Sequence, residues 1–198
     1  MYLTPAAIGY GVQVLLALLI TGYLVWLTRH ATSRFLHLRL LIGFFGWLTA
    51  FLLFLFFETA LLSNGRIVLY FINVALAIAL LFLLQFAYYF PALPEGWRVE
   101  QRVVLWLSVL YALGETIYAF YRLVILLGLQ QVLYRPNWAD YVLLALFLWV
   151  PVVFFRQLIL QRPGVPWWKV LWQPKMALAR GLSSFVVIFL VAALLNVV

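Results

Sequence analysis

The sequence contains six runs of about 20 or more largely apolar residues, separated by short polar segments. A helix that crosses the roughly 30 Å hydrocarbon core of a bilayer needs about 20 such residues. Because the runs are apolar on every side and do not alternate with a period of two, they predict helices rather than the strands of a membrane barrel. We expect an all-α polytopic membrane helix bundle that forms a single transmembrane domain over residues 1–198. The six expected helices cover residues 5–28, 38–62, 67–90, 101–129, 137–160 and 181–198.

The composition supports this expectation. Hydrophobic residues make up 68% of the chain and charged residues only 9%, whereas a soluble domain has roughly 45–50% and about 25%. The net charge of +8 would suggest nucleic acid on a soluble protein, but here the basic residues fall between the apolar runs. In such positions they set topology and contact anionic lipid. We therefore expect membrane lipids as partners and no nucleic acid.

The basic residues also predict an orientation. Nine lie in the connections after the first, third and fifth runs, and only Arg66 and Arg135 lie in the other connections. The positive-inside rule then places the N-terminus outside and the three basic connections in the cytoplasm. We expect an integral protein of a bacterial inner membrane. The sixth run ends at Val198 without a polar flank, which favours a longer protein.

Several local signals refine the expected helices. Thr4 is suited to cap the first helix, with Pro5 at its first position. The alanines of residues 75–79 predict close helix packing, either within the chain or in a homodimer. Pro151 predicts a kink in the fifth helix. Tryptophans and lysines alternate in residues 161–180, which predicts an interfacial segment that acts as an anchor or as a docking surface for a cytoplasmic partner.

The sequence gives little support to an enzyme. Asp140 is the only aspartate, so a pair of catalytic aspartates is excluded, and both histidines, His30 and His37, lie in the first basic connection. There is no cysteine, which removes thiol chemistry and cysteine-based metal sites. We expect no catalytic residues, no metal and no cofactor.

The polar residues within the apolar runs are the candidate functional residues, because burying an ionisable group in hydrocarbon is costly. Glu115 lies near the middle of the fourth run, and Arg122 follows seven residues later on the same helix face. Glu58 and Asn73 lie in the outer halves of their runs, as does Gln13. We take Glu115, Arg122, Glu58 and Asn73 as ligand-binding candidates that would line a cavity open to the outside. The alternative is that Glu115 and Arg122 only fasten the bundle.

Three features are similar to a known class of membrane domain: the segment LQFAYYFP at residues 84–91, the mid-helix Glu115, and the segment YRPNWADY at residues 134–141. With its short loops and external N-terminus, the chain resembles the N-terminal multi-helix sensor modules of bacterial histidine kinases and related signalling proteins. The resemblance implies a module of the seven-helix type with a cytoplasmic effector domain. The sequence departs from that pattern because it holds six helices, as a truncated module would.

The expected function is therefore a transmembrane sensor or receptor module. It would bind a ligand or lipid in its outer half and pass a helix rearrangement to the cytoplasmic side. Two alternatives stay open on the sequence alone. One is a transporter or channel subunit that uses Glu115, and the other is a structural accessory subunit of a larger membrane complex.

Overall fold

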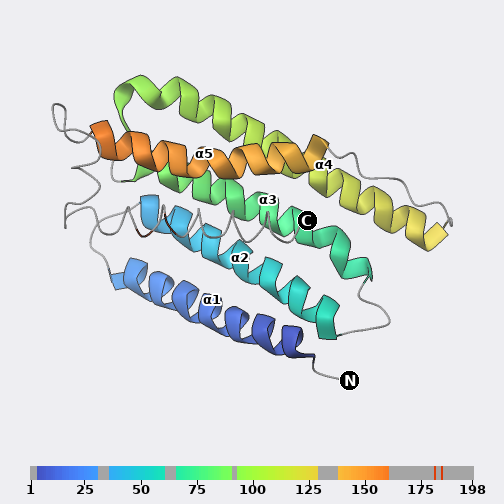
Figure 1. Ribbon diagram of the computed structural model, residues 1–198. Helices are drawn as coiled ribbons and strands as arrows, with labels where there is room; N and C mark the ends of the chain where they lie inside the picture. Colours follow the sequence, from blue (N-terminus) through green and yellow to red (C-terminus); the bar gives the residue numbers. More distant parts are fainter. Residues whose placement is uncertain are drawn as a thin grey trace. The chain divides into compact units, whose positions relative to one another are not determined.

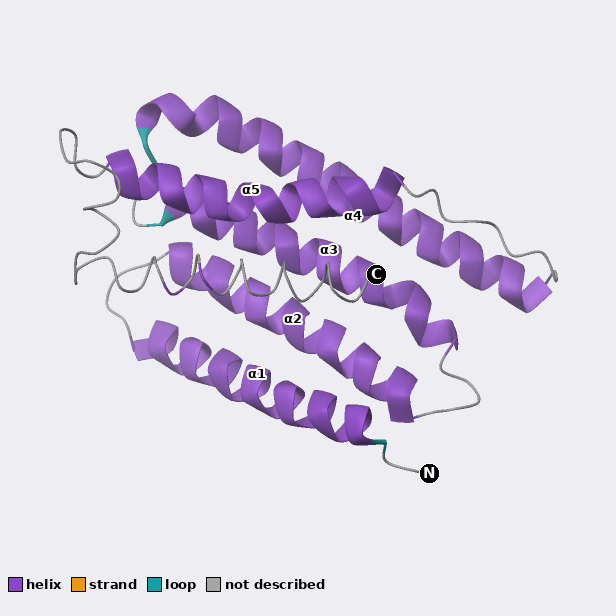
Figure 2. Cartoon of the chain, in the orientation of Figure 1, coloured by secondary structure: helices purple, strands orange, loops and turns teal. Residues whose placement is uncertain are grey.

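The computed structural model describes residues 4–30, 36–60, 66–90, 93–128 and 138–160, together with residues 181 and 184. Within these residues the chain is helical and has no strand (Figure 2). The long helices, coloured along the chain in Figure 1, are α1 (Pro5–His30), α2 (Leu36–Ala60), α3 (Arg66–Tyr89), α4 (Arg98–Gly128) and α5 (Trp138–Leu160). All five are long and apolar enough to cross a membrane. This confirms the all-helical class expected of a membrane protein.

The sixth expected helix is not among these five. Its residues 181–198, like the connection 161–180, lie outside the described residues except for Gly181 and Ser184. The chain divides into two compact units, Met1–Arg135 and Pro136–Val198. Unit 1 contains α1 to α4, and the long helix described in unit 2 is α5.

The helix boundaries follow the local sequence signals closely. The backbone N–H of Ala7 donates to Thr4 Oγ1 at 3.2 Å, which confirms the predicted N-cap of α1. The fourth helix begins at Arg98, three residues before the predicted start at residue 101. The reason is a 3-10 turn, η1 (Glu95–Trp97), which follows the extended Pro94 and leads directly into α4. The connection between α3 and α4 is therefore shorter than the expected helix bounds imply.

Unit 1 is a row of consecutive helices in which α1 packs on α2, α2 on α3 and α3 on α4 (Figure 1). The helices alternate in direction, so one end of the row holds the end of α1, the start of α2, the end of α3 and the start of α4. We call it the basic end because four arginines lie there: Arg29, Arg39, Arg98 and Arg102. The other end is the opposite end.

Helix α3 is the core of unit 1. Ala75 and Ala79 lie on one face of it and Ala77 on another, and all three are buried. Small side chains let neighbouring backbones approach closely, so the predicted packing role of residues 75–79 is confirmed within the chain. The packing between α2 and α3 is tight at Gly43, where an added Cβ atom would lie 2.5 Å from Cδ1 of Phe82.

The outer faces of the row are apolar. On α1 the exposed side chains include Leu15, Leu19 and Trp26, and on α4 they include Leu110 and Ile117. Contiguous apolar surface of this kind would be unfavourable in water and is the normal exterior of a helix that faces lipid tails.

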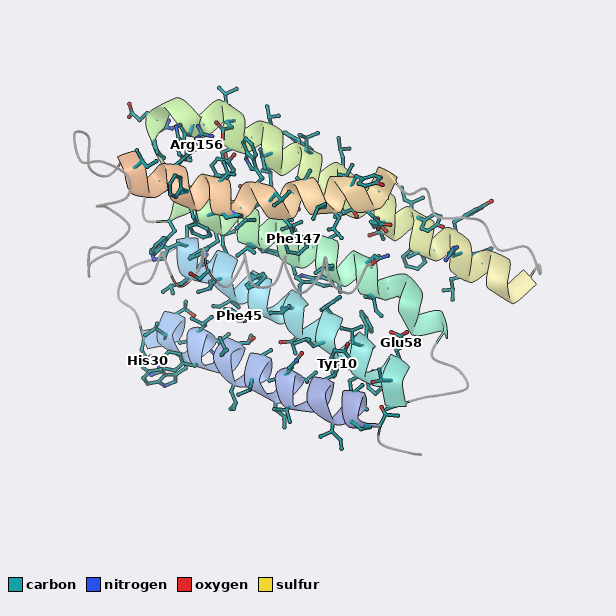
Figure 3. All side chains as sticks on the ribbon, in the orientation of Figure 1. Tyr10, His30, Phe45, Glu58, Phe147 and Arg156 are labelled. Atoms are coloured by element: carbon teal, nitrogen blue, oxygen red, sulfur yellow. The ribbon has the colours of Figure 1, made fainter. Side chains whose placement is uncertain are left out.

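In unit 2, helix α5 continues through Pro151, which has no backbone N–H to donate to the carbonyl of Phe147. Val150, Val153 and Phe154 are buried on both sides of this position. Figure 3 labels Phe147 and Arg156 on the helix. The kink at Pro151 stays a prediction.

Candidate functional site

Four polar or charged side chains follow one another along α4: Tyr111, Glu115, Tyr118 and Arg122. At 100° per residue they fall within about 60° of helix surface. We call this set the charged face of α4. Each charged residue follows a tyrosine by four positions, the spacing at which two side chains on a helix touch.

Glu115 is the buried carboxyl group of this face. Its side chain is 6% exposed, and it lies inside the apolar segment Glu95–Val124. The hydroxyl of Tyr111 donates to Glu115 Oε1 at 2.9 Å. Burying a carboxylate carries a large desolvation cost unless it is hydrogen-bonded or neutralised by a proton or a cation. The tyrosine orients the carboxyl group and satisfies one of its oxygens.

Arg122 lies about 10 Å further along the helix axis, at 1.5 Å per residue, towards the opposite end. Its Cζ atom is 5.2 Å from the centroid of the Tyr118 ring. The side chain is half-buried. A guanidinium group over an aromatic face is attracted by the ring quadrupole and keeps its N–H donors directed sideways. The contact therefore helps to fix the position of the cation.

The other two candidates, Asn73 and Glu58, lie on other helices and are half-buried. Asn73 belongs to α3, two residues from Phe71, whose ring contacts that of Phe120 on α4 at 5.8 Å. Asn73 therefore lies at a depth along the helix axes that is close to that of Glu115. Figure 3 shows Glu58 at the opposite end of α2, beside the end of α1 that bears Tyr10.

The structure does not bring all four candidates together. Within the described part of the chain, no hydrogen bond or ion pair joins Glu58 or Asn73 to Glu115 or Arg122. Gln13, which we expected near them, is exposed on α1. The polar group that the structure does assemble is the charged face of α4, with Asn73 at a similar depth on the neighbouring helix.

A second polar cluster lies at the basic end, between α3 and α4, and the sequence reasoning missed it. Gln101 Nε2 donates to Gln85 Oε1, and the Tyr88 hydroxyl donates to Glu100 Oε1 at 2.8 Å. Gln85 and Tyr88 precede the loop after α3, and Glu100 and Gln101 follow it. This arrangement was the sequence signal that could have revealed the cluster. A pair of polar residues before a tight connection and another pair after it will meet when the helices run antiparallel.

The charged face also belongs to a longer pattern. Gln101, Ser108, Glu115 and Arg122 are spaced by seven residues, so they lie on one side of α4 with a slow drift. The first three are buried. Together they extend over about 30 Å, at 1.5 Å per residue, which matches the thickness of the hydrocarbon core. This seven-residue spacing of polar residues can be read from the sequence of this one helix.

The side chains of the charged face can support only a few kinds of chemistry. Among the described residues, no group of three or more histidine, cysteine, aspartate or glutamate side chains could hold a metal ion. A buried carboxyl group can take up a proton or bind an ammonium group, and a guanidinium group binds phosphate or carboxylate. The chain matches no protein-family model, no curated protein and no solved structure.

Proposed function

We propose that the chain is a transmembrane sensor or receptor module whose ligand binds at the charged face of α4. The observation that carries the proposal is Glu115, a carboxyl group that is 6% exposed inside an apolar segment and is oriented by the Tyr111 hydroxyl. A charge placed so deeply costs free energy, and a role in binding is the usual reason for such a residue in a membrane helix. Arg122 supplies a charge of opposite sign on the same face.

The spacing of the two charges indicates a zwitterionic ligand. An ammonium group would bind Glu115, and a phosphate or carboxylate group would bind the guanidinium of Arg122. The two residues lie roughly 10 Å apart along the helix axis, and the Arg122 side chain reaches back over the Tyr118 ring, towards Glu115. A free zwitterion and the headgroup of a zwitterionic lipid share this chemistry.

The route of the signal follows from the continuity of α4. The same helix that bears Glu115 begins at the basic end, where Gln101 and Glu100 contact Gln85 and Tyr88 of α3. A ligand that binds one tilt of α4 better than another shifts the population between the two. The shift would reach the connection between α3 and α4.

The orientation belongs to the same proposal. The basic end would lie in the cytoplasm of a bacterial cell and the N-terminus outside, because nine basic residues fall in the three connections on one side and two on the other. The chain has no cysteine, so single cysteines at Gly96 and at Gly65 would report sidedness. An impermeant thiol reagent should label them from opposite sides, and labelling of both from one side would contradict the orientation.

The ligand is tested with two probes of the same chemistry. Purified protein would be heated with phosphoethanolamine, with a short-chain phosphatidylethanolamine, or with a short-chain phosphatidylglycerol, which lacks the ammonium group. A ligand at 100 times its Kd stabilises the folded state by about 2.7 kcal/mol. We expect one ethanolamine probe to raise Tm and phosphatidylglycerol to have little effect. Which of the two ethanolamine probes acts identifies the source as a free solute or a lipid.

The variants make the test specific. Glu115→Gln is nearly isosteric and should abolish the rise in Tm, as should Arg122→Gln. The matched control is Arg102→Gln, because Arg102 is an exposed arginine on the same helix. An unchanged Tm with all probes would contradict the proposal. Uptake of phosphoethanolamine into vesicles by the protein would instead identify a transporter that uses Glu115.

A further inference from the structure

The buried face of α4 carries a polar side chain at every seventh position from Gln101 to Glu115. Gln101 is 6% exposed and Ser108 1% exposed. The Ser108 hydroxyl donates to the carbonyl of Val104 at 2.7 Å, which leaves its oxygen lone pairs as acceptors. Between Ser108 and Glu115, the Tyr111 hydroxyl already bonds the carboxyl group. Polar atoms therefore recur along this face from the basic end to the middle of the span.

The basic end of this series contains an unsatisfied polar group. Gln85 is 4% exposed, and its Nε2 atom is buried without a hydrogen-bond partner. The same amide accepts from Gln101 through its Oε1 atom. An N–H group left without an acceptor in a protein interior costs about 1–3 kcal/mol, and ordered water is the usual acceptor at such places.

The helix that packs against α4 in unit 1 adds no competing charge near Glu115. From Phe71 to Leu84, α3 has no titratable residue, and its titratable residues further on are Tyr88 and Tyr89 at the basic end. On α4 itself the titratable neighbours of Glu115 are Tyr111, Tyr118 and Arg122. Among these residues, Glu115 is therefore the only carboxyl group.

We infer that a file of water molecules follows the buried face of α4 from the Gln85 amide past Ser108 to Glu115, and that protons reach the Glu115 carboxyl group along it from the basic end. In this step a proton from bulk water passes from one water to the next by exchange of hydrogen bonds and forms an O–H bond on a carboxylate oxygen. The reverse step returns it. The inference stands whether or not a zwitterion binds at the charged face.

The test uses cysteine accessibility, because the chain has no cysteine of its own. Ser108→Cys places a thiol in the series, and Thr49→Cys is its matched control. Both parent hydroxyls are buried and donate to the carbonyl four residues earlier at 2.7 Å, but Thr49 lies on α2, outside the series. A small cationic methanethiosulfonate reacts with the thiolate form, which needs water. We expect Ser108→Cys to react about ten or more times faster than Thr49→Cys, since thiolate formation requires hydration.

The direction is tested in vesicles of known protein orientation, with the reagent on one side at a time. Ser108→Cys should react from the side of the basic end, and adding Gln85→Leu should slow that reaction about tenfold or more, as expected when a water site is lost. Equal rates for Ser108→Cys and Thr49→Cys, or reaction from the opposite end alone, would overturn the inference. If Ser108→Cys fails to fold, Ala112→Cys replaces it, because Ala112 is buried one turn further along the same face.

Discussion

The two halves of α4 hold their polar side chains in different ways. At the basic end the hydrogen bonds cross between helices, from Gln101 to Gln85 and from Tyr88 to Glu100. Further along, the described contacts that orient the charged residues run within α4, from Tyr111 to Glu115 and from Tyr118 to Arg122. Cross-helix bonds fix one helix against another. Contacts within one helix orient a side chain but impose no helix position.

This difference distinguishes polar residues that hold two helices together from polar residues whose side chains are oriented in advance for binding. A polar residue whose partner lies on the next helix stabilises the bundle, and its loss should appear in the free energy of unfolding. A polar residue held by its own helix is kept in one rotamer, which lowers the entropic cost of binding. Substitutions that remove a described cross-helix bond at the basic end should therefore lower stability, and we expect substitutions on the charged face to weaken binding of the ethanolamine probe.

The largest effect is expected for Gln101→Leu. This change removes the only described protein partner of the Gln85 side chain and leaves its buried amide without a hydrogen bond to the protein. The free energy of unfolding should fall by about 1–3 kcal/mol, measured by thermal or denaturant unfolding in detergent.

The double variant Gln85→Leu with Gln101→Leu is the informative control. Replacing both partners by apolar groups removes the unsatisfied amide, so its stability should return close to that of the parent. If the double variant is as unstable as the two single changes added together, the glutamines do not act as a pair and the contrast between the two halves of α4 fails.

A second prediction concerns the close packing of α2 on α3. In Gly43→Ala the new Cβ would lie 2.5–2.8 Å from three ring atoms of Phe82, including Cγ at the base of the ring. Rotation of the ring cannot relieve this overlap, so we expect a loss of about 1–3 kcal/mol. Gly46→Ala is the matched control on the same helix, because nothing lies within 4 Å of its added Cβ. There the better helix propensity of alanine should raise stability by about 0.5–1 kcal/mol.

The smallest effect is expected on the charged face. Tyr118→Leu removes the ring under Arg122, and the stability should fall by only about 0.5–1 kcal/mol, the usual value of such a contact. The rise in Tm caused by the ethanolamine probe should fall more than the stability does. Tyr118→Phe keeps the aromatic face and should behave like the parent. A large loss of stability in Tyr118→Leu would assign Arg122 to fastening.

The sequence was sufficient for the elements that depend on local chemistry. Helix class, the Thr4 cap and the packing role of residues 75–79 follow from hydrophobicity, hydrogen-bonding capacity and side-chain size. The start of α4 was predicted three residues late, since a 3-10 turn after a proline leaves no periodic signal.

The pairing of Gln85 with Gln101 could not be predicted in the same way. It depends on the register between two helices, which the connecting loop sets and which hydrophobicity does not encode. The resemblance to sensor modules and the inside–outside orientation also remain predictions. Neither is a property of a single helix.

The row arrangement of unit 1 has a consequence for how the protein is made. In this row α2 packs on α1, α3 on α2 and α4 on α3, so each of these helices contacts the one that precedes it in the chain. During synthesis, a newly inserted helix of this row therefore finds its neighbour already in the bilayer. The polar groups of α4 are the last of this unit to be inserted, and by then α3, which holds the partners of Gln101 and Glu100, is already in place to receive them.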